Sequence, residues 1–252
     1  LKIISKTLHF LRKFNLISNS NLQYSLFVLY DYFFLRCVSK RKIIIDQSIL
    51  VVRNGAATRF ISKFKKRGLK VIIHAQWLHP VFQKENVERA YLKLGINFIQ
   101  KSSKLLKRQK LDFLLTDKIW TFSELGARTF INEGIDKDKI LIQNLGANKN
   151  KFYFRKATKR EGSKRYKLLF VGNISPEKGV DFFLEYLLKM NSLVTDITFL
   201  GKVESNFKDY FFNQIAELKR IGINCEVKFG KSYEEYVEAD LLVLPSVHDS
   251  FG

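Results

Sequence analysis

A chain of 252 residues, 46% of them hydrophobic and 14% aromatic, has enough apolar surface for one large or two modest domains, which excludes a globally disordered protein. Its formal net charge of +20 suggests a polyanionic partner, but the charge is unevenly distributed. Residues 1–166 hold 35 Lys plus Arg against 11 Asp plus Glu, whereas residues 167–252 hold 9 against 13, so a basic surface is expected only in the first part.

The cysteines and the apolar stretches indicate a cytoplasmic protein. Cys37 and Cys225 lie far apart, with no CxxC pair and no secretory leader, so neither a disulfide framework nor a structural zinc site is supported. The most apolar stretch, 26–38, is interrupted by Asp31 and Arg36 and is shorter than the roughly 20 apolar residues that cross a bilayer. The sequence therefore predicts no membrane span.

The first part of the chain alternates loosely between helical and strand patterns. Helices are expected near residues 22–38, 58–66, 85–115 and 124–133, and strands near 48–52, 70–74, 118–122 and 139–143. Such an alternation is typical of βαβ units around a parallel sheet. Residues 1–148 are interpreted as one α/β domain, and the basic, aperiodic stretch 149–166 as an exposed linker.

The second part shows the same alternation more regularly. Strands are expected at 167–171, 197–200, 225–229 and 241–244, and helices at 181–190, 207–221 and 232–238. Joined by right-handed crossovers, these elements predict a second parallel, doubly wound α/β domain at 167–252. Because the chain starts at Leu1 and stops directly after an apolar strand, we expect both domains to be incomplete.

A loop with the features of an anion site follows the strand at 167–171. It reads Gly172-Asn173-Ile174-Ser175-Pro176-Glu177-Lys178-Gly179 and opens a helix. Gly172 permits a sharp turn, the helix start presents unpaired N–H groups with a positive dipole end, and Lys178 adds a full charge. The loop is neither a Walker A loop nor a GxGxxG fingerprint. On local chemistry alone, a phosphate site and a purely structural turn are equal alternatives.

The stretch from Leu168 to Gly179 resembles the donor-domain signature of the family four, or group 1, retaining glycosyltransferases. A second match runs from Ala239 to Gly252, with an apolar strand, Pro-Ser, and a carboxylate before Phe-Gly. A third, Ser123-Glu124 with Gly134, Lys139-Ile140 and Leu145-Gly146-Ala147-Asn148, resembles the end of the acceptor domain and the hinge. The resemblance covers roughly the last half of the chain and implies the GT-B fold, two Rossmann-like domains that face a cleft.

The resemblance also implies a donor-binding set. Lys178 corresponds to the lysine that contacts the donor diphosphate, and Asp249 to the first of two glutamates that contact the sugar and ribose. Asn173 stands where the family often has an arginine, which leaves one cationic phosphate contact instead of two. The other expected donor-binding residues are Gly172, Asn173, Gly179, Phe229, Gly230, Lys231, Ser246, Phe251 and Gly252.

Two residues of the first domain are singled out by position. His74 ends the strand at 70–74, at a sheet edge that would face the cleft, where the family often has a histidine near the reacting sugar. His74 and Asp249 are therefore the expected catalytic residues, although a structural histidine is the alternative for His74. Ser123 is most simply the N-cap of the helix at 124–133.

A basic surface is expected in the first domain. Residues 63–70 and 101–110 concentrate cations near apolar residues on expected helices, and such a surface attracts anionic lipid by about 1 kcal/mol per Lys or Arg. This would place the enzyme at the inner face of the membrane, where cell-envelope polysaccharides receive sugars on lipid-linked acceptors. The alternative is a solvated, Lys-rich face.

The activity that the resemblance implies is metal-independent transfer of a sugar from a nucleoside diphosphate sugar to a hydroxyl of a glycan or lipid-linked acceptor. The donor is a co-substrate, and no cofactor is expected. A nucleic-acid-binding protein that uses the basic half is the rival, weakened because the phosphate-type loop lies in the acidic half. A catalytically inactive homologue is the other alternative, suggested by Asn173 and Asp249.

Overall fold

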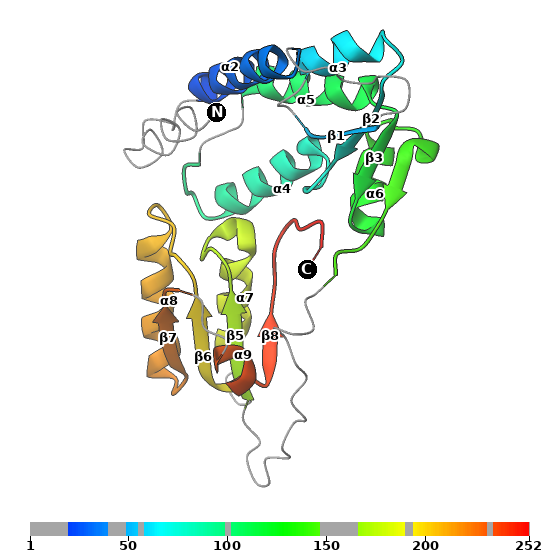
Figure 1. Ribbon diagram of the computed structural model, residues 1–252. Helices are drawn as coiled ribbons and strands as arrows, with labels where there is room; N and C mark the ends of the chain where they lie inside the picture. The colour runs from blue at the N-terminus through cyan, green and yellow to red at the C-terminus, as the bar shows by residue number, and fades with distance from the viewer. Residues whose placement is uncertain are drawn as a thin grey trace. The chain divides into compact units, whose positions relative to one another are not determined.

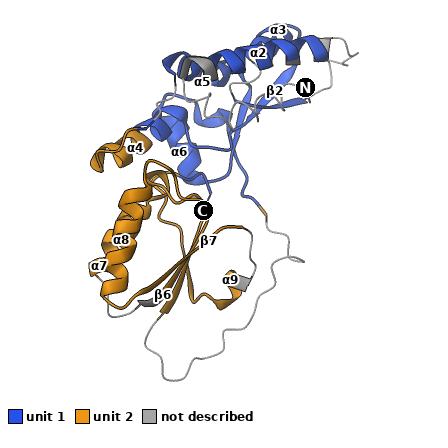
Figure 2. Cartoon of the chain, turned by 90° about the vertical axis from the view of Figure 1, so that its left-hand side faces the viewer, with its two compact units in different colours: residues 1–85, 98–145, 249–251 blue, residues 86–97, 146–248, 252 orange. Residues whose placement is uncertain are grey.

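The computed structural model describes residues 20–39, 49–54, 58–98, 102–146, 166–189, 194–230 and 234–251. The chain divides into two compact units, distinguished in Figure 2. Unit 1 comprises residues 1–85, 98–145 and 249–251, and unit 2 comprises residues 86–97, 146–248 and 252. Each unit contains a four-stranded parallel sheet with helices packed against it, which confirms the predicted α/β fold with two Rossmann-like units.

Unit 1 is built on the sheet order β1-β2-β3-β4. Its strands are β1 (Ile49–Arg53), β2 (Lys70–His74), β3 (Lys118–Thr121) and β4 (Ile140–Ile142). Its helices are α2 (Ser20–Ser39), α3 (Thr58–Lys65), α5 (Ser103–Leu115), α6 (Glu124–Asn132) and the 3-10 helix η1 (Lys137–Lys139). The helix α3 packs against α2 and α5 (Figure 1). The apolar sides of these elements share one core, which includes Phe60, Val71, Ile73, Phe113, Ile119 and Phe130.

The start of α6 confirms one prediction from the sequence. The Ser123 side chain accepts a hydrogen bond of 3.0 Å from the Gly126 backbone N–H, so Ser123 is the N-cap. Gly126 lies against Thr121, the last residue of β3. The cap therefore fixes the turn between β3 and α6.

The helical region expected at 85–115 is divided between two helices in the structure. The structure has α4 (Pro80–Lys93) and α5, separated by residues that include Gly95 with a φ of 65°. Pro80 suits a first helical position, and a left-handed glycine just after the last turn ends a helix. The Ile96 N–H closes this turn by donating to the Tyr91 carbonyl at 3.1 Å. Residues 86–97, which the sequence places in the first domain, pack with unit 2.

Unit 2 is built on the sheet order β7-β6-β5-β8. Its strands are β5 (Tyr166–Val171), β6 (Val194–Leu200), β7 (Asn224–Lys228) and β8 (Leu241–Val243). Its helices are α7 (Val180–Lys189), α8 (Lys208–Arg220), the short α9 (Glu234–Glu238) and the 3-10 helix η2 (Pro176–Lys178). A cluster of phenylalanine rings, Phe170, Phe183, Phe199 and Phe211, joins β5 and β6 to α7 and α8.

The linker expected at 149–166 lies outside the described residues except for Tyr166, which begins β5. Within the described ranges, no helix is long and apolar enough to cross a bilayer.

Candidate functional site

The strand order of unit 2 reverses between β5 and β8, which creates a topological switch point at the carboxyl ends of these strands. From β5 the sheet continues to β6 and β7 on one side, whereas β8 lies on the other side of β5. All four strands are parallel, so their carboxyl ends meet at the same edge. Open α/β sheets bind ligands outside the carboxyl ends of their strands, where the strand order reverses. We call the loops 172–179 and 244–248, which follow β5 and β8, the switch-point edge.

The first loop of the switch-point edge is fixed to β6. Gly172 has a φ of 142°, and its N–H donates to the Leu200 carbonyl at 3.0 Å. A Cβ atom on Gly201 would lie 1.8 Å from the Gly172 carbonyl oxygen, so the two backbones approach as closely as only glycines allow. Ile174 then pairs with Val203 in an isolated parallel bridge. The loop thus continues the sheet beyond the end of β5.

The two loops of the switch-point edge are packed against each other. Gly179 has a φ of 67°, and a Cβ atom there would lie 1.9 Å from the Pro245 carbonyl oxygen. The Val247 N–H donates to the Glu177 carbonyl oxygen at 3.3 Å, and His248 Nε2 lies 2.9 Å from Glu177 Oε1. The loops 172–179 and 244–248, which belong to two separate stretches that resemble the family signature, therefore lie side by side in the structure.

Lys178 supplies the cation of the switch-point edge. It is half-buried and ends the 3-10 helix η2, whose turn is closed by the Lys178 N–H donating to the Ser175 carbonyl at 3.1 Å. Gly179 follows, and α7 begins at Val180, so Lys178 stands beside a helix N-terminus with its positive dipole end. Asn173 is exposed and Ser246 is half-buried. The edge combines one full positive charge with polar groups, which suits a phosphate.

Residues 86–97 contact α7 and the loop after β6, next to the switch-point edge. The Tyr91 hydroxyl donates to the Glu204 carboxylate, just beyond the bridge residue Val203. Burial raises the pKa of Tyr91 most, and the hydrogen bond to Glu204 and the charges of Glu204 and Glu177 raise it further, so the hydroxyl stays neutral. Nothing in the sequence pattern singles out Tyr91 for this contact.

A lysine attaches the same segment to α7. Lys93 Nζ lies 2.9 Å from Glu185 Oε1 and 3.6 Å from Asp181 Oδ2, and it sits 4.0 Å from the Phe182 ring centroid. Asp181 is fully buried, and burial raises its pKa while the Lys93 charge lowers it. Lys93 therefore partly compensates a buried carboxyl group in the first turn of α7.

Phe229 and Gly230, which are also expected to bind the donor, lie outside the two packed loops. Phe229 and Gly230 follow β7 at the same sheet edge, two strands from β5, and Phe229 is 84% exposed. An exposed ring in this place could stack on a flat ligand. Lys231 and Gly252 lie outside the described residues.

The residues expected to act on the sugar belong to unit 1. Asp249 and Phe251 cluster with that unit, where the neighbouring Ser250 hydroxyl donates to the Gln76 carbonyl at 2.6 Å. The structure therefore places Asp249 in a different compact unit from Lys178, and its contact with a donor sugar stays a prediction.

His74 ends β2 within a cluster of aromatic rings. Its ring centroid lies 4.5 Å from that of Trp120 and 5.0 Å from that of Phe122. Burial lowers the pKa of His74, and Arg53 lowers it further, so the imidazole is neutral near pH 7. Its buried Nε2 has no hydrogen-bond partner among the described residues. These features suit a neutral hydrogen-bonding group, and the catalytic assignment stays a prediction.

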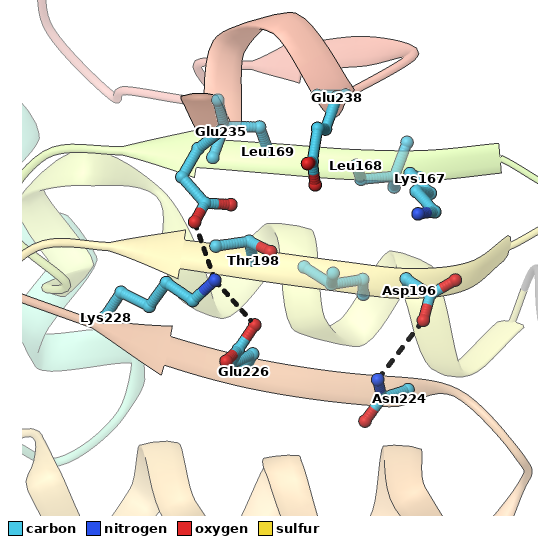
Figure 3. Close-up of a pocket in the computed structure, with 12 residues that line it drawn as sticks. Lys167, Leu168, Leu169, Asp196, Thr198, Asn224, Glu226, Lys228, Glu235 and Glu238 are labelled. Atoms are coloured by element: carbon cyan, nitrogen blue, oxygen red, sulfur yellow. Dashed lines mark hydrogen bonds and ion pairs between the residues drawn. The ribbon is translucent and has the colours of Figure 1, made fainter. Parts of the chain in front are cut away.

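A separate hollow lies on the face of the unit 2 sheet that α9 partly covers. It is lined by polar strand residues, including Asp196, Thr198 and Glu226, and by Glu235 and Glu238 of α9 (Figure 3). Lys228 Nζ pairs with Glu235 Oε1 at 2.6 Å and with Glu226 Oε2 at 3.0 Å. Since its described lining includes none of the predicted site residues, this hollow does not coincide with the switch-point edge.

The chain is similar in structure to several solved proteins, although no family model and no curated protein matches it in sequence. The apo form of the lipopolysaccharide outer core galactosyltransferase WaaB aligns with a TM-score of 0.58 and 13% identity, over 90% of this chain and 56% of WaaB. The catalytic domain of starch synthase IV from Arabidopsis thaliana, bound to ADP and acarbose, gives 0.56 and 13%, over 91% of this chain and 57% of that one.

A third solved structure is HepE from Anabaena in complex with UDP. It aligns with a TM-score of 0.54 and 14% identity, over 78% of this chain and 53% of HepE. The chain thus spans about half the length of the proteins it matches. At these identities the likeness establishes the fold, and the chain has the two parallel-sheet α/β units of the GT-B glycosyltransferase fold.

Proposed function

We propose that the protein is a retaining glycosyltransferase, and that the switch-point edge of unit 2 binds the diphosphate of a nucleoside diphosphate sugar. The observation that carries the proposal is the contact of Gly179 with Pro245, which joins the loops after β5 and β8 beside Lys178. Two of the solved structures with this fold are complexes with nucleoside diphosphates, UDP in HepE and ADP in starch synthase IV.

In this reaction the protein mainly positions the donor and the acceptor and stabilises the negative charge of the departing group. During transfer the bond between the sugar C1 and the diphosphate oxygen breaks, and a bond from C1 to the acceptor oxygen forms on the same face. The departing phosphate takes the acceptor's proton in the mechanism that the family resemblance implies. Lys178 and the N-terminus of α7 would stabilise the negative charge that develops on the departing group, without a metal ion.

The acceptor in this proposal is a hydroxyl of a glycan or of a lipid-linked sugar. The support comes from α5 of unit 1, on which Lys104, Lys107 and Lys110 are exposed together with Leu111 and Leu114, 44% and 64% exposed. Cations beside exposed leucines favour an anionic lipid surface over a purely aqueous one. The same cations underlie the nucleic-acid alternative, which salt-dependent binding of an oligonucleotide without any nucleotide-sugar binding would favour.

The proposal is tested by turnover of nucleotide sugars. We expect the protein to release nucleoside diphosphate from one class among UDP-, GDP- and ADP-glucose, slowly with water as the acceptor. Proton NMR of the freed sugar should show the α anomer first, because the donor is an α-glycoside and the configuration is retained. A β anomer would contradict retention. Donor binding without turnover would instead support a catalytically inactive homologue.

A further inference from the structure

A histidine from the loop after β8 holds the carboxylate beside Lys178. The His248 side chain is fully buried, and its Nε2 lies 2.9 Å from Oε1 of Glu177, whose side chain is 36% exposed. A carboxylate only accepts hydrogen bonds, so the shared proton belongs on Nε2. The Nδ1 atom is buried and has no hydrogen-bond partner among the described residues. The imidazole therefore directs its Nε2–H at Glu177.

The position of Glu177 creates an electrostatic conflict. It directly precedes Lys178 in η2, so a carboxylate stands next to the cation proposed to bind a diphosphate. A mobile carboxylate there would repel the phosphates. The charge of Glu177 is also felt by Tyr91, whose pKa is raised by burial first and then by Glu204 and Glu177. The Glu177 charge is therefore close enough to Tyr91 to act on its hydroxyl group.

Backbone contacts already join the two loops without the imidazole. The Val247 N–H donates to the Glu177 carbonyl oxygen, and Gly179 packs on the Pro245 backbone. The hydrogen bond from His248 to Glu177 fixes the position of the Glu177 carboxylate, which the backbone contacts do not do. This separates a role in electrostatics from a role in packing.

We propose that His248 is a positioning residue for donor binding, which holds the Glu177 carboxylate on the β8 loop and so keeps its negative charge from moving toward the donor diphosphate. The inference rests on the proposed function, since it requires Lys178 to bind a diphosphate. In the sequence, Glu177 and His248 lie inside the two stretches that resemble the family signature, but the resemblance gives neither residue a role. Only the packed loops connect the two residues.

The test is a double-variant cycle read by calorimetric titration with UDP, GDP and ADP. His248→Ala should weaken binding of the preferred nucleotide about five- to tenfold, because Glu177 is released beside Lys178. Glu177→Gln removes the charge and should bind within about twofold of the wild type. The double variant should recover to within about twofold of Glu177→Gln, because no charge is left to control. His248→Gln keeps an N–H donor and should retain most of the affinity.

The outcomes separate three cases. If the double variant binds as weakly as His248→Ala, the imidazole acts through packing, and the positioning role is overturned. If His248→Ala binds like the wild type, the role is also overturned, while wild-type binding keeps the proposed function. If the folded wild type binds none of the three nucleotides, the proposed function fails and this inference fails with it. Thermal unfolding of each variant shows whether it is folded, and His248→Gln keeps the test decisive if His248→Ala unfolds.

Discussion

Replacing Gly179 with alanine is expected to destabilise unit 2 by about 3 kcal/mol and to abolish nucleotide binding. A non-glycine residue at a φ of 67° costs about 1 kcal/mol, and forcing a Cβ atom into a filled space costs about 1–3 kcal/mol more. Here the obstacle is the Pro245 carbonyl oxygen at 1.9 Å, which cannot move without moving the loop after β8. Denaturant unfolding measures the loss of stability, and titration with UDP, GDP and ADP measures the loss of binding.

Gly222→Ala is the matched control for this substitution. Gly222 lies in the same unit with a φ of 86°, but a Cβ atom there has no heavy atom within 4 Å. The free energy of unfolding should therefore fall only by the cost of a non-glycine residue at positive φ, about 1 kcal/mol, and nucleotide binding should be unchanged. Equal losses for both variants would show that the Gly179 to Pro245 contact contributes nothing of its own.

Lys178→Ala is expected to weaken binding of the preferred nucleoside diphosphate by ten- to a hundredfold. A hydrogen bond between charged groups contributes about 1.5–3 kcal/mol, and each 1.4 kcal/mol corresponds to tenfold in affinity. Because Lys178 is only half-buried and its backbone bonds stay, the free energy of unfolding should change by less than about 0.5 kcal/mol. Calorimetric titration at fixed salt measures the change in affinity.

Lys189→Ala controls for the loss of a positive charge. Lys189 is exposed at the opposite end of the same helix, α7, so its removal changes the net charge equally. Its nucleotide affinity should stay within about twofold of the wild type. If both lysine variants lose affinity to the same extent, nucleotide binding depends on the overall electrostatic field of the protein, and Lys178 does not contact the diphosphate specifically.

The architecture could be predicted because it follows from local patterns. Apolar runs that alternate with amphipathic segments indicate βαβ units, and the order of elements in unit 2 follows the expected one. The cap at Ser123 and the start of α7 after Gly179 were visible for the same reason, since caps and left-handed glycines have sequence signatures. Even so, the end of α4 at Gly95 was missed, because helical periodicity continues on both sides of that glycine.

The contacts that assemble the candidate site could not be predicted. The pair of His248 and Glu177 joins residues 71 positions apart, and the pair of Tyr91 and Glu204 joins residues 113 positions apart. Neither pair produces a hydrophobic periodicity or a sequence motif, because each contact involves only one side chain from each of two distant segments. The doubly wound sheet predicted from the sequence implies a switch point, but the order of strands along the chain does not decide that β8 lies beside β5 and not beyond β7.

The most direct test of the central claim is to follow the backbone amide signals of the protein by NMR during titration with UDP, GDP and ADP. Uridine, guanosine and adenosine serve as controls that lack the diphosphate. We predict that one diphosphate, and not its nucleoside, shifts the amides of Gly172, Asn173, Lys178 and Gly179, which follow β5 at the switch-point edge. Shifts confined to other surfaces of the folded protein, or none with any of the three nucleotides, would contradict the account.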